Sequence, residues 1–452
     1  MKLNAIQLKH TAHFHSIQLN LNEQPITLIM GEQGSGKSSL LKHTFQALTW
    51  FSARLKDGRS SGVSMMDQDI EHGRQQSKIN ISVRIDADLG SFAEATTTQA
   101  QDTQQCGWQI YKVLANAGGV GTSQATIGQL EQLVQLYQRA QKADPMQGLP
   151  LIAYYPQDRF VSEINLVSKN NPAIFQSPHA YEFTGIPFTT FTRFFEWLRE
   201  IHDIENAQSA QLLQQFLQQH PQLDPLEQQF QSQLLLAQKQ LHAPSLLALK
   251  HSLKTVLPEI EDLFLQYQPK LQLMVKYQGQ LIQYLQLPHS LRNWIALVGD
   301  IVRRLCVLNP KSIAPCQEGN GILLIDAVDH QLDDLHCQDI LLRLHQAFPQ
   351  LQIIATGQHS ELLDQQQHYQ CYRLFEQRLI PITAQTTQLQ FDQLYSELFK
   401  EPCHEPISLQ EPNLEDPVIS LLTQIQQQLS PQQQQQLIQQ LRDGEQPFVE
   451  NR

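Results

Sequence analysis

Residues 31–38, with the sequence GEQGSGKS, combine glycines, a lysine and serines in a spacing that can bind phosphate. Glycines in such a loop let the backbone curl, so that consecutive N–H groups point at phosphate oxygens. The ammonium group of Lys37 can then reach the β- and γ-phosphates, and the hydroxyl group of Ser38 can ligate Mg²⁺. We therefore predict a nucleoside triphosphate site formed by Gly31, Gly34, Ser35, Gly36, Lys37, Ser38 and Ser39.

The elements that flank this loop must hold it in place. Residues 26–30 predict a strand before the loop, and residues 39–42 predict the first turn of a helix after it. The N-terminus of that helix would direct its positive dipole at the same phosphates. A chance glycine-rich turn is the alternative interpretation, and the strand–loop–helix order argues against it.

Two further polar residues follow apolar strands. Residues 322–325 are wholly apolar, as in a strand buried in a parallel sheet, and Asp326 follows them. A carboxylate at this position is expected to be the second Mg²⁺-side ligand of a phosphate-loop enzyme. Residues 151–155 form a similar strand, and Gln157 at its polar tip could reach the Mg²⁺ and the attacking water. The sequence thus predicts a metal site of Ser38, Asp326 and Gln157.

The bulk composition is that of a soluble globular protein. The chain has 452 residues, of which 41% are hydrophobic and 17% charged, and its length suits one large domain or about two to three ordinary ones. The formal charge of −12 argues against broad coating of nucleic acid, although it is compatible with a local basic groove. No apolar run reaches the roughly 20 residues of a membrane helix. Residues 1–8 alternate like a strand, unlike a signal peptide, so we expect a cytoplasmic protein without a membrane partner.

The sequence also contains residue types that bind transition metals. Six cysteines are present without a C-x-x-C pair, so we expect reduced thiols rather than a zinc site. His10, His13 and His15 could form a metal cluster. Since no acidic or thiol ligand stands near them in the sequence, we favour histidines at a strand end beside Phe14.

Alternating patterns predict an antiparallel part of the fold. Residues 3–9 and 17–21 are expected to pair, and so are residues 79–85 and 108–113. Further strands are expected at 263–267, 271–277, 281–285 and 352–356. Helices are expected at 191–201, 294–308 and 338–347. We also expect a loop at 93–105 and a turn at 118–121.

The order of the parts resembles that of the ABC-type ATPase heads of the RecF/SMC class. A phosphate loop near residue 31 is followed by a helical insert, an aspartate at 326 and a histidine one strand later. Three motifs sharpen the resemblance: YYP at 154–156 with Arg159, FFEW at 194–197 with Asp203, Glu205 and Asn206, and LVGD at 297–300 with Arg303, Arg304 and Leu305. Together they are similar to a RecF-like family of predicted ATP-binding proteins involved in virulence, related to ATPases of phage-defence systems such as the Septu component PtuA. The similarity covers most of residues 1–400.

The resemblance implies an α/β fold: a P-loop NTPase of ABC/SMC-head type with a mixed sheet, an antiparallel β-subdomain and a helical lid insertion. It implies ATP and Mg²⁺ as cofactors, and a homodimer formed through the ATPase heads. The expected regions are an N-terminal ATPase lobe at 1–190, a helical insertion (lid or short hairpin) at 191–258, a C-terminal ATPase lobe at 259–402 and a glutamine-rich helical tail at 403–452.

The resemblance also implies roles for single residues. Gln157 sits where such heads keep the Q-loop glutamine, and Asp326 ends the Walker B strand. His359 falls at the switch histidine, which in these heads contacts the γ-phosphate. Residues 287–292 (LPHSLR) occupy the signature motif, which contacts the γ-phosphate held by the other subunit of a head-to-head dimer.

Two of these motifs depart from the family pattern. Ala327 stands where the family has the glutamate that orients or deprotonates the attacking water, and loss of such a group typically lowers the rate by about 10²–10⁴. Pro288 and Ser290 replace the signature serine and glycine, which removes donors to phosphate and adds a Cβ atom. Asp329 or His330 could replace the missing base, but each is displaced along the chain.

These features leave three functions open. The first is a nucleotide-gated switch with weak or absent hydrolysis, in DNA repair or anti-phage defence. The second is an active ATPase that works on DNA with a partner effector, such as a separate nuclease chain. The third is a structural subunit with a relic loop, and the retention of Lys37 with Ser38 argues against it. The candidate contacts to DNA phosphates are Arg159, Arg292, Arg303 and Arg304, and the alternative for each is an arginine that is solvated or paired with an acid.

Overall fold

The computed structural model describes residues 1–21, 24–90, 92, 104–114, 122–145, 147–161, 164, 180–181, 191–219 and 244–382. These residues belong to the compact unit Met1–Leu389, whereas the unit Gln390–Arg452 lies outside them. Most of the predicted loop at 93–105, the predicted turn at 118–121, the middle of the helical insertion and the predicted tail at 403–452 also lie outside the described residues. Within the described part, no helix is both long and apolar enough to cross a membrane.

The central element is a six-stranded sheet in the order β14-β13-β3-β12-β11-β7. Its parallel strands are β3 (Ile26–Met30), β7 (Leu151–Tyr155), β11 (Gly321–Ile325), β12 (Leu351–Gly357) and β13 (Gln370–Phe375). The sheet is mixed because β14 (Arg378–Ile382) pairs antiparallel with β13. Every residue of β3, β7, β11 and β12 is buried, which explains why their sequences are apolar runs instead of alternating patterns. Both predicted lobes contribute strands to this one sheet.

A second, five-stranded sheet has the order β2-β1-β4-β5-β6 and is antiparallel throughout. Its strands are β1 (Lys2–Thr11), β2 (Phe14–Asn20), β4 (Gln76–Arg84), β5 (Gln105–Val113) and β6 (Thr122–Thr126). Both predicted pairings are confirmed, with Ile79 opposite Ile110 in the β4–β5 pair. The Gln352 side chain joins this sheet to the mixed sheet, because it accepts the N–H of Leu3 at 2.6 Å and donates to the Leu3 carbonyl oxygen at 2.9 Å.

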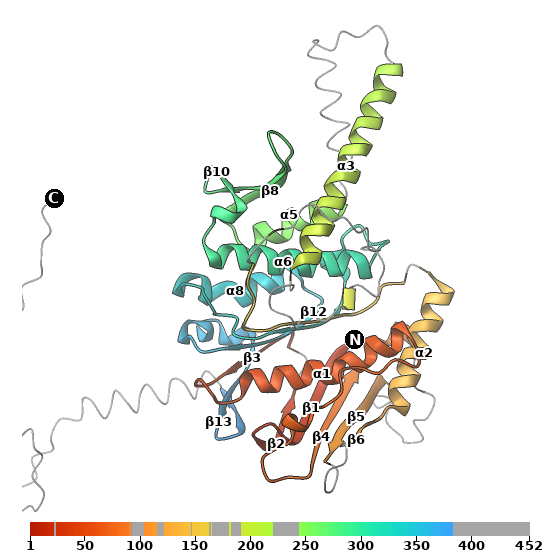
Figure 1. Cartoon of the computed structure of the whole chain (residues 1–452), viewed down its shortest axis with the longest axis vertical. Coiled ribbons are helices and arrows are strands. Elements are labelled where there is room, and N and C mark those ends of the chain that lie inside the picture. Colours follow the sequence, from red (N-terminus) through yellow and green to blue (C-terminus); the bar gives the residue numbers. More distant parts are fainter. Residues whose placement is uncertain are drawn as a thin grey trace, which may run out of the picture. The chain divides into compact units, whose positions relative to one another are not determined.

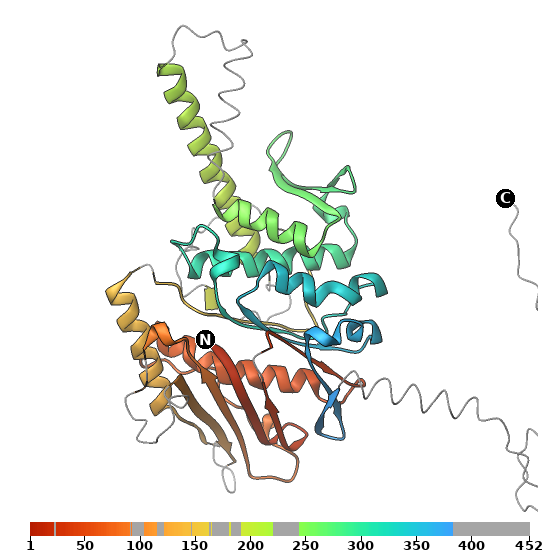
Figure 2. The ribbon, with the colours of Figure 1, turned by 180° about the vertical axis from the view of Figure 1, so that it is seen from behind.

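Helix α1 (Lys37–Lys56) lies between the two sheets, as Figures 1 and 2 show. It contacts β7 and β11 of the mixed sheet and β4 of the antiparallel sheet. Its buried side chains include the predicted apolar stripe with Leu40, Leu48 and Phe51. Trp108 of β5 donates its Nε1–H to the carbonyl oxygen of Ala47 at 2.9 Å, which fixes the helix on that sheet. Helix α2 (Gly128–Ala143) packs against both β5 and α1.

The other face of the mixed sheet carries further long helices (Figure 1). They are α3 (Thr192–Gln219), α5 (Pro244–Val256), α6 (His289–Leu308) and α8 (Asp334–Ala347), with the short α7 (Pro315–Glu318). Helix α6 contacts β7 and also α5, which in turn contacts α8. A three-stranded antiparallel sheet follows α5, made of β8 (Ile260–Gln266), β9 (Gln272–Tyr277) and β10 (Gln280–Gln283). The structure therefore confirms the predicted fold class, with a mixed sheet, an antiparallel subdomain and an inserted helical segment.

Candidate nucleotide-binding site

The loop between β3 and α1 is shaped by glycines in left-handed conformations. Gly34 has a φ angle of 82° and Gly36 one of 104°. A Cβ atom on Gly36 would also lie 2.1 Å from His13 Nε2 and 2.6 Å from Phe14 Cζ. Both the dihedral angle and the close approach exclude a side chain at Gly36, so the loop can reach the N-terminus of α1 only with glycine there.

Lys37 is the first residue of α1, and its side chain folds back over the loop. Its Nζ donates to the carbonyl oxygen of Gly31 at 2.6 Å and to that of Glu32 at 2.8 Å. Burial lowers the pKa of Lys37, while the nearby Asp326 and Asp329 carboxylates act to raise it. A buried ammonium group bonded to neutral carbonyls suits an anionic ligand, because a phosphate oxygen supplies the opposite charge.

Asp326 follows β11 and is almost fully buried. The Thr356 hydroxyl donates to Asp326 Oδ1 at 2.6 Å and accepts the N–H of Ala327 at 2.8 Å. The guanidinium group of Arg159 donates to the carbonyl oxygens of Asp326 at 2.5 Å and Ala327 at 2.7 Å. These bonds fix the turn after β11 and hold the carboxylate at the edge of the sheet where the phosphate loop also lies.

The loop, the end of β11 and the end of β12 enclose a cavity of about 250 Å³. The predicted site residues that line it are Gly34, Gly36, Lys37, Ser38, Ser39, Gln157 and Asp326. Gly31 and Ser35 belong to the loop but not to this lining. The hydroxyl, carboxylate and amide oxygens of Ser38, Asp326 and Gln157 are hard ligands of the kind that Mg²⁺ prefers. The residues present therefore fit a Mg²⁺–triphosphate, with the loop and Lys37 at the phosphates.

His359, the predicted switch histidine, lies beside acidic side chains and outside the described lining of the cavity. The Nδ1 atom of His359 lies 3.8 Å from a carboxylate oxygen of Glu361 and 3.9 Å from one of Asp334. Among the described lining residues of the cavity, Gln358 is present and His359 is not. Asp329 Oδ2 accepts the backbone N–H groups of both Gln358 and His359, at 2.5 and 2.7 Å. A contact from His359 to a γ-phosphate stays a prediction.

The lining also includes residues that had not been predicted as site residues, among them Thr356 and His13. Thr356 lies near the end of β12, and His13 lies in the turn between β1 and β2 with its Nε2 3.2 Å from the Ser35 carbonyl oxygen. The signal for Thr356 was its position after an apolar run, because parallel strands end at the same edge of a sheet. No sequence pattern pointed from His13 to the loop, since the packing of the β1–β2 hairpin creates this contact.

Position 327, where the resemblance predicted a catalytic glutamate, supplies no base to the cavity. Asp326 is the single carboxylate among the described residues that line it, and Ala327 beside it carries only a methyl group. Asp329, considered as a replacement, is 3% exposed, and its Oδ2 is occupied by two backbone N–H groups. Asp329 is also absent from the described residues that line the cavity.

The four arginines considered as DNA contacts are buried. Their exposed fractions are 4% for Arg159, 8% for Arg292, 1% for Arg303 and 2% for Arg304. The Nε atoms of Arg303 and Arg304 donate to the two carboxylate oxygens of Asp300, at 2.8 and 2.7 Å. Burial opposes the ionisation of Asp300, but the two guanidinium groups outweigh it and hold the pKa of this carboxyl below its usual range. Arg303 and Arg304 are thus paired with an acid, which was the alternative considered for them, and buried guanidinium groups at all four positions cannot reach a DNA backbone.

The segment predicted as the signature motif, residues 287–292, lies at the start of α6. Pro288 precedes the helix and Ser290 lies in its first turn. Both line a second cavity of about 380 Å³, together with Gln331 from the segment after β11. Contact of this segment with a nucleotide in another subunit stays a prediction.

Relatives of the chain are named as ATPases. The Retron Vc95 probable ATPase of Vibrio cholerae serotype O1 biovar El Tor is 25% identical over 394 residues, which cover 80% of this chain and 71% of the relative. The Retron Ec83 probable ATPase of Escherichia coli is 25% identical over 389 residues, which cover 79% of this chain and 68% of the relative.

Solved structures of SMC heads are similar at a coarse level. The Smc head domain with an extended coiled coil bound to the C-terminal domain of ScpA, derived from Pyrococcus furiosus, has a TM-score of 0.46 at 10% identity, covering 87% of this chain and 99% of that one. The SMC head domain from Thermotoga maritima has a TM-score of 0.39 at 10% identity, covering 85% and 100%. The family described as AAA domain matches residues 5–272, more than half of the sequence and including the phosphate loop. The chain belongs to this AAA domain family.

Proposed function

We propose that this chain is a cytoplasmic, ATP-binding RecF/SMC-like protein that acts as a nucleotide-gated switch with weak or absent hydrolysis. The observation that carries the proposal is one cavity lined by Gly34, Gly36, Lys37 and Ser38 of the phosphate loop and by Ala327, at the position where the family has its base. Lys37, Ser38 and Asp326 supply the groups that bind Mg²⁺–ATP. A nucleotide shifts a protein between two states through its different affinity for them, and this requires no hydrolysis.

Anti-phage defence is the favoured setting, and DNA repair is the alternative. Both relatives described above are named as retron ATPases. The motifs at 154–156, 194–197 and 297–300 resemble those of phage-defence ATPases such as PtuA and of the family of predicted ATP-binding proteins involved in virulence. A homodimer through the heads and a separate effector or nuclease chain complete the proposal. In this arrangement the segment 287–292 of one head would face the nucleotide of the other.

The second candidate function is an active ATPase that works on DNA with a partner effector. The names of the relatives favour it, because both are described as probable ATPases. The base would then be a group other than residue 327, for example one from a second copy across a head-to-head dimer. DNA contact would need basic residues other than the four buried arginines.

Calorimetric titration with Mg²⁺–ATP beside a steady-state phosphate-release assay separates these functions. Binding without turnover supports the switch, whereas brisk turnover that disappears in Lys37→Ala supports the active ATPase. A chain that neither binds nor hydrolyses ATP would overturn both. Light scattering with and without ATP tests the homodimer, and salt-dependent DNA binding measured under the same two conditions tests the DNA partner.

A further inference from the structure

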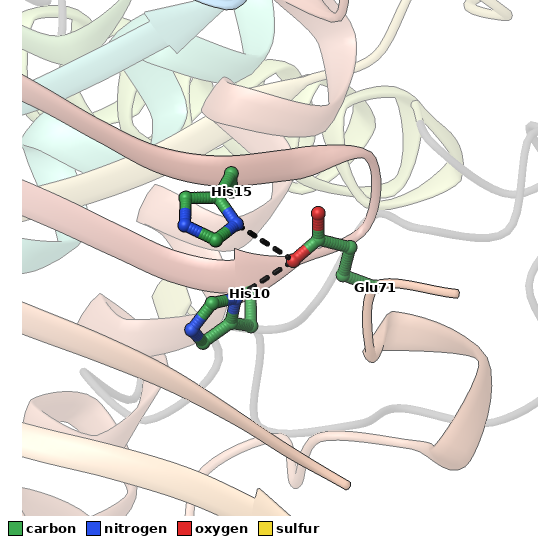
Figure 3. Close-up of side chains that lie close together, drawn as sticks. All are labelled: His10, His15 and Glu71. Carbon is green, nitrogen blue, oxygen red and sulfur yellow. Dashed lines mark hydrogen bonds and ion pairs between the residues drawn. The ribbon is translucent and has the colours of Figure 1, made fainter. Parts of the chain in front are cut away.

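Three side chains of metal-binding types meet beside the turn of the β1–β2 hairpin. His10 comes from β1, His15 from β2, and Glu71 follows the short helix η1 (Asp67–Asp69). His10 Nδ1 lies 2.7 Å from Glu71 Oε2, and His15 Nδ1 lies 3.5 Å from the same oxygen (Figure 3). The two imidazole rings are 4.6 Å apart and meet at 81°. The three possible ligand atoms all lie within 4.8 Å of one another.

Backbone contacts hold these segments together independently of the side chains. The N–H of Glu71 donates to the carbonyl oxygen of His10 at 3.0 Å. The N–H of Ala12 donates to the carbonyl oxygen of Asp69 at 2.7 Å, and an antiparallel bridge joins the residues between these two bonds. The ligands are therefore brought together before any ion binds, which reduces the entropy lost on binding.

The ligand types and spacings fit a tetrahedral zinc site. Zn²⁺ binds histidine nitrogen and carboxylate oxygen at about 2.0–2.2 Å, which places neighbouring ligand atoms of a tetrahedron about 3.3–3.6 Å apart. The observed distance of 3.5 Å between His15 Nδ1 and Glu71 Oε2 lies in this range. The distance of 2.7 Å between His10 Nδ1 and the same oxygen is shorter, so His10 would have to move slightly outward. Two histidines and one carboxylate leave the fourth position for water. We propose that His10, His15 and Glu71 bind a divalent transition-metal ion of the zinc class.

The cluster is accessible from solvent. The exposed fractions of the side chains are 28% for His10, 57% for His15 and 21% for Glu71. An ion can therefore enter from solvent without displacing packed side chains.

The guanidinium group of Arg74 would compete with a metal ion for the three proposed ligands. Its Nε lies 3.6 Å from Glu71 Oε2, and an Nη atom lies 3.4 Å from His15 Nδ1. Half of the Arg74 side chain is exposed, so the guanidinium group can turn into solvent when an ion takes its position. This competition predicts that removal of Arg74 strengthens metal binding, an effect that a plain ion-pair cluster would not show.

The test is a titration of the chelator-treated full chain with Zn²⁺ alone, in the absence of nucleotide. We expect one equivalent to bind with a Kd of about 10⁻⁶ M or lower, and Co²⁺ to give the visible absorption of a tetrahedral site. His10→Ala and Glu71→Gln should each weaken binding by at least about 10–100-fold, as losses in metal sites do. Arg74→Ala should tighten binding several-fold.

Two controls separate this site from others. His72→Ala changes an exposed neighbour of Glu71, and Asp334→Asn changes a second possible ligand group of Asp334, His359 and Glu361; both should leave the Zn²⁺ affinity unchanged. The Tm measured in the presence of chelator reports whether each variant folds. If His10→Ala does not fold, His15→Ala replaces it in the test, because His15 is more exposed. Absence of Zn²⁺ binding in the wild type would overturn the proposal. So would an unchanged affinity in folded Glu71→Gln and His15→Ala, or a loss of binding in Asp334→Asn.

Discussion

Asp329 accepts the backbone N–H of His359 at 2.7 Å through the same oxygen that accepts the N–H of Gln358 at 2.5 Å. The carboxylate is buried and joins the segment after β11 to the segment after β12. Both segments border the nucleotide cavity, since Ala327 and Gln358 line it. A change at Asp329 should therefore disturb both sides of the cavity without removing a nucleotide contact.

Asp329→Asn keeps the shape of the side chain but removes its charge and one acceptor oxygen. We expect a loss of about 1.5–3 kcal/mol in the free energy of unfolding, the usual contribution of hydrogen bonds to a charged group. Chemical denaturation measures this value. Asp364→Asn alters an exposed carboxylate and should change stability by less than about 0.5 kcal/mol. Equal effects of the two variants would show that the Asp329 bonds contribute little.

Lys37→Ala removes the cation of the phosphate loop. We expect the affinity for Mg²⁺–ATP to fall by about 10–100-fold, because a charge-assisted hydrogen bond contributes about 1.5–3 kcal/mol. Isothermal titration calorimetry measures the affinity. Lys42→Ala removes an exposed lysine from the same helix and serves as the matched control. A nucleotide affinity that is the same in both variants would place the binding site elsewhere.

Ala327→Glu restores a carboxylate beside Asp326. We expect the ATP turnover rate to rise by about 10²-fold or more, which is the lower range for a general base. Ala327 has a φ angle of 45°, and alanine already carries the Cβ atom that makes this conformation unfavourable, so the larger side chain adds little backbone strain. Ala327→Gln has the same shape without the base and should remain slow. A turnover rate that rises equally in both variants, or in neither, contradicts the role assigned to this position.

Asp300 links stability to pH. Its folded-state pKa is held below the unfolded value of about 3.9, because Arg304 and Arg303 outweigh the effect of burial. The folded state therefore binds fewer protons than the unfolded state between the two pKa values, and stability rises with pH across this window. The contribution of Asp300 is present above about pH 4 and is lost as the pH falls through the folded pKa.

Asp300→Asn tests this linkage. It should destabilise the protein by about 3–5 kcal/mol at neutral pH, because Arg303 and Arg304 lose their buried partner. Urea denaturation between about pH 3 and 7 should show a smaller acid-dependent loss in the variant than in the wild type. Parallel pH profiles would show that other carboxyl groups cause the dependence.

Gly36→Ala tests the close approach of the loop to His13. The added Cβ would lie 2.1 Å from His13 Nε2, and the φ angle of 104° is unfavourable for alanine. We expect nucleotide binding to be lost and stability to fall by about 1–3 kcal/mol. Gly58→Ala adds a Cβ with no atom within 4 Å and should leave both quantities nearly unchanged. Normal nucleotide affinity in Gly36→Ala would contradict the described loop geometry.

Local patterns of apolar and polar residues predicted most strands and helices of the fold. The alternation in residues 79–85 and 108–113 gave β4 and β5, and the apolar runs gave β11 and β12. Strands β6, β13 and β14 were not predicted. Both β6 and β14 are edge strands without a buried face and are ordered by the backbone of a neighbour. Helix α2 was also missed, although its buried residues Leu130, Leu133, Val134 and Tyr137 have helical spacing.

The sequence by itself determined the glycine-rich loop and the absence of a carboxylate at position 327. Gly34, Gly36 and Lys37 encode a local backbone path and its cation, and Ala327 lacks a carboxylate in any fold. These features depend on the size and the φ and ψ preferences of adjacent residues, so they can be read without long-range contacts.

Only the tertiary structure decided which groups meet. It places Thr356 and His13 at the nucleotide cavity and brings Glu71 to His10. Burial and charge pairing arise when strands far apart in the chain share a sheet edge or a hairpin turn. The spacing of residues along the sequence does not predict which of these distant segments lie close together.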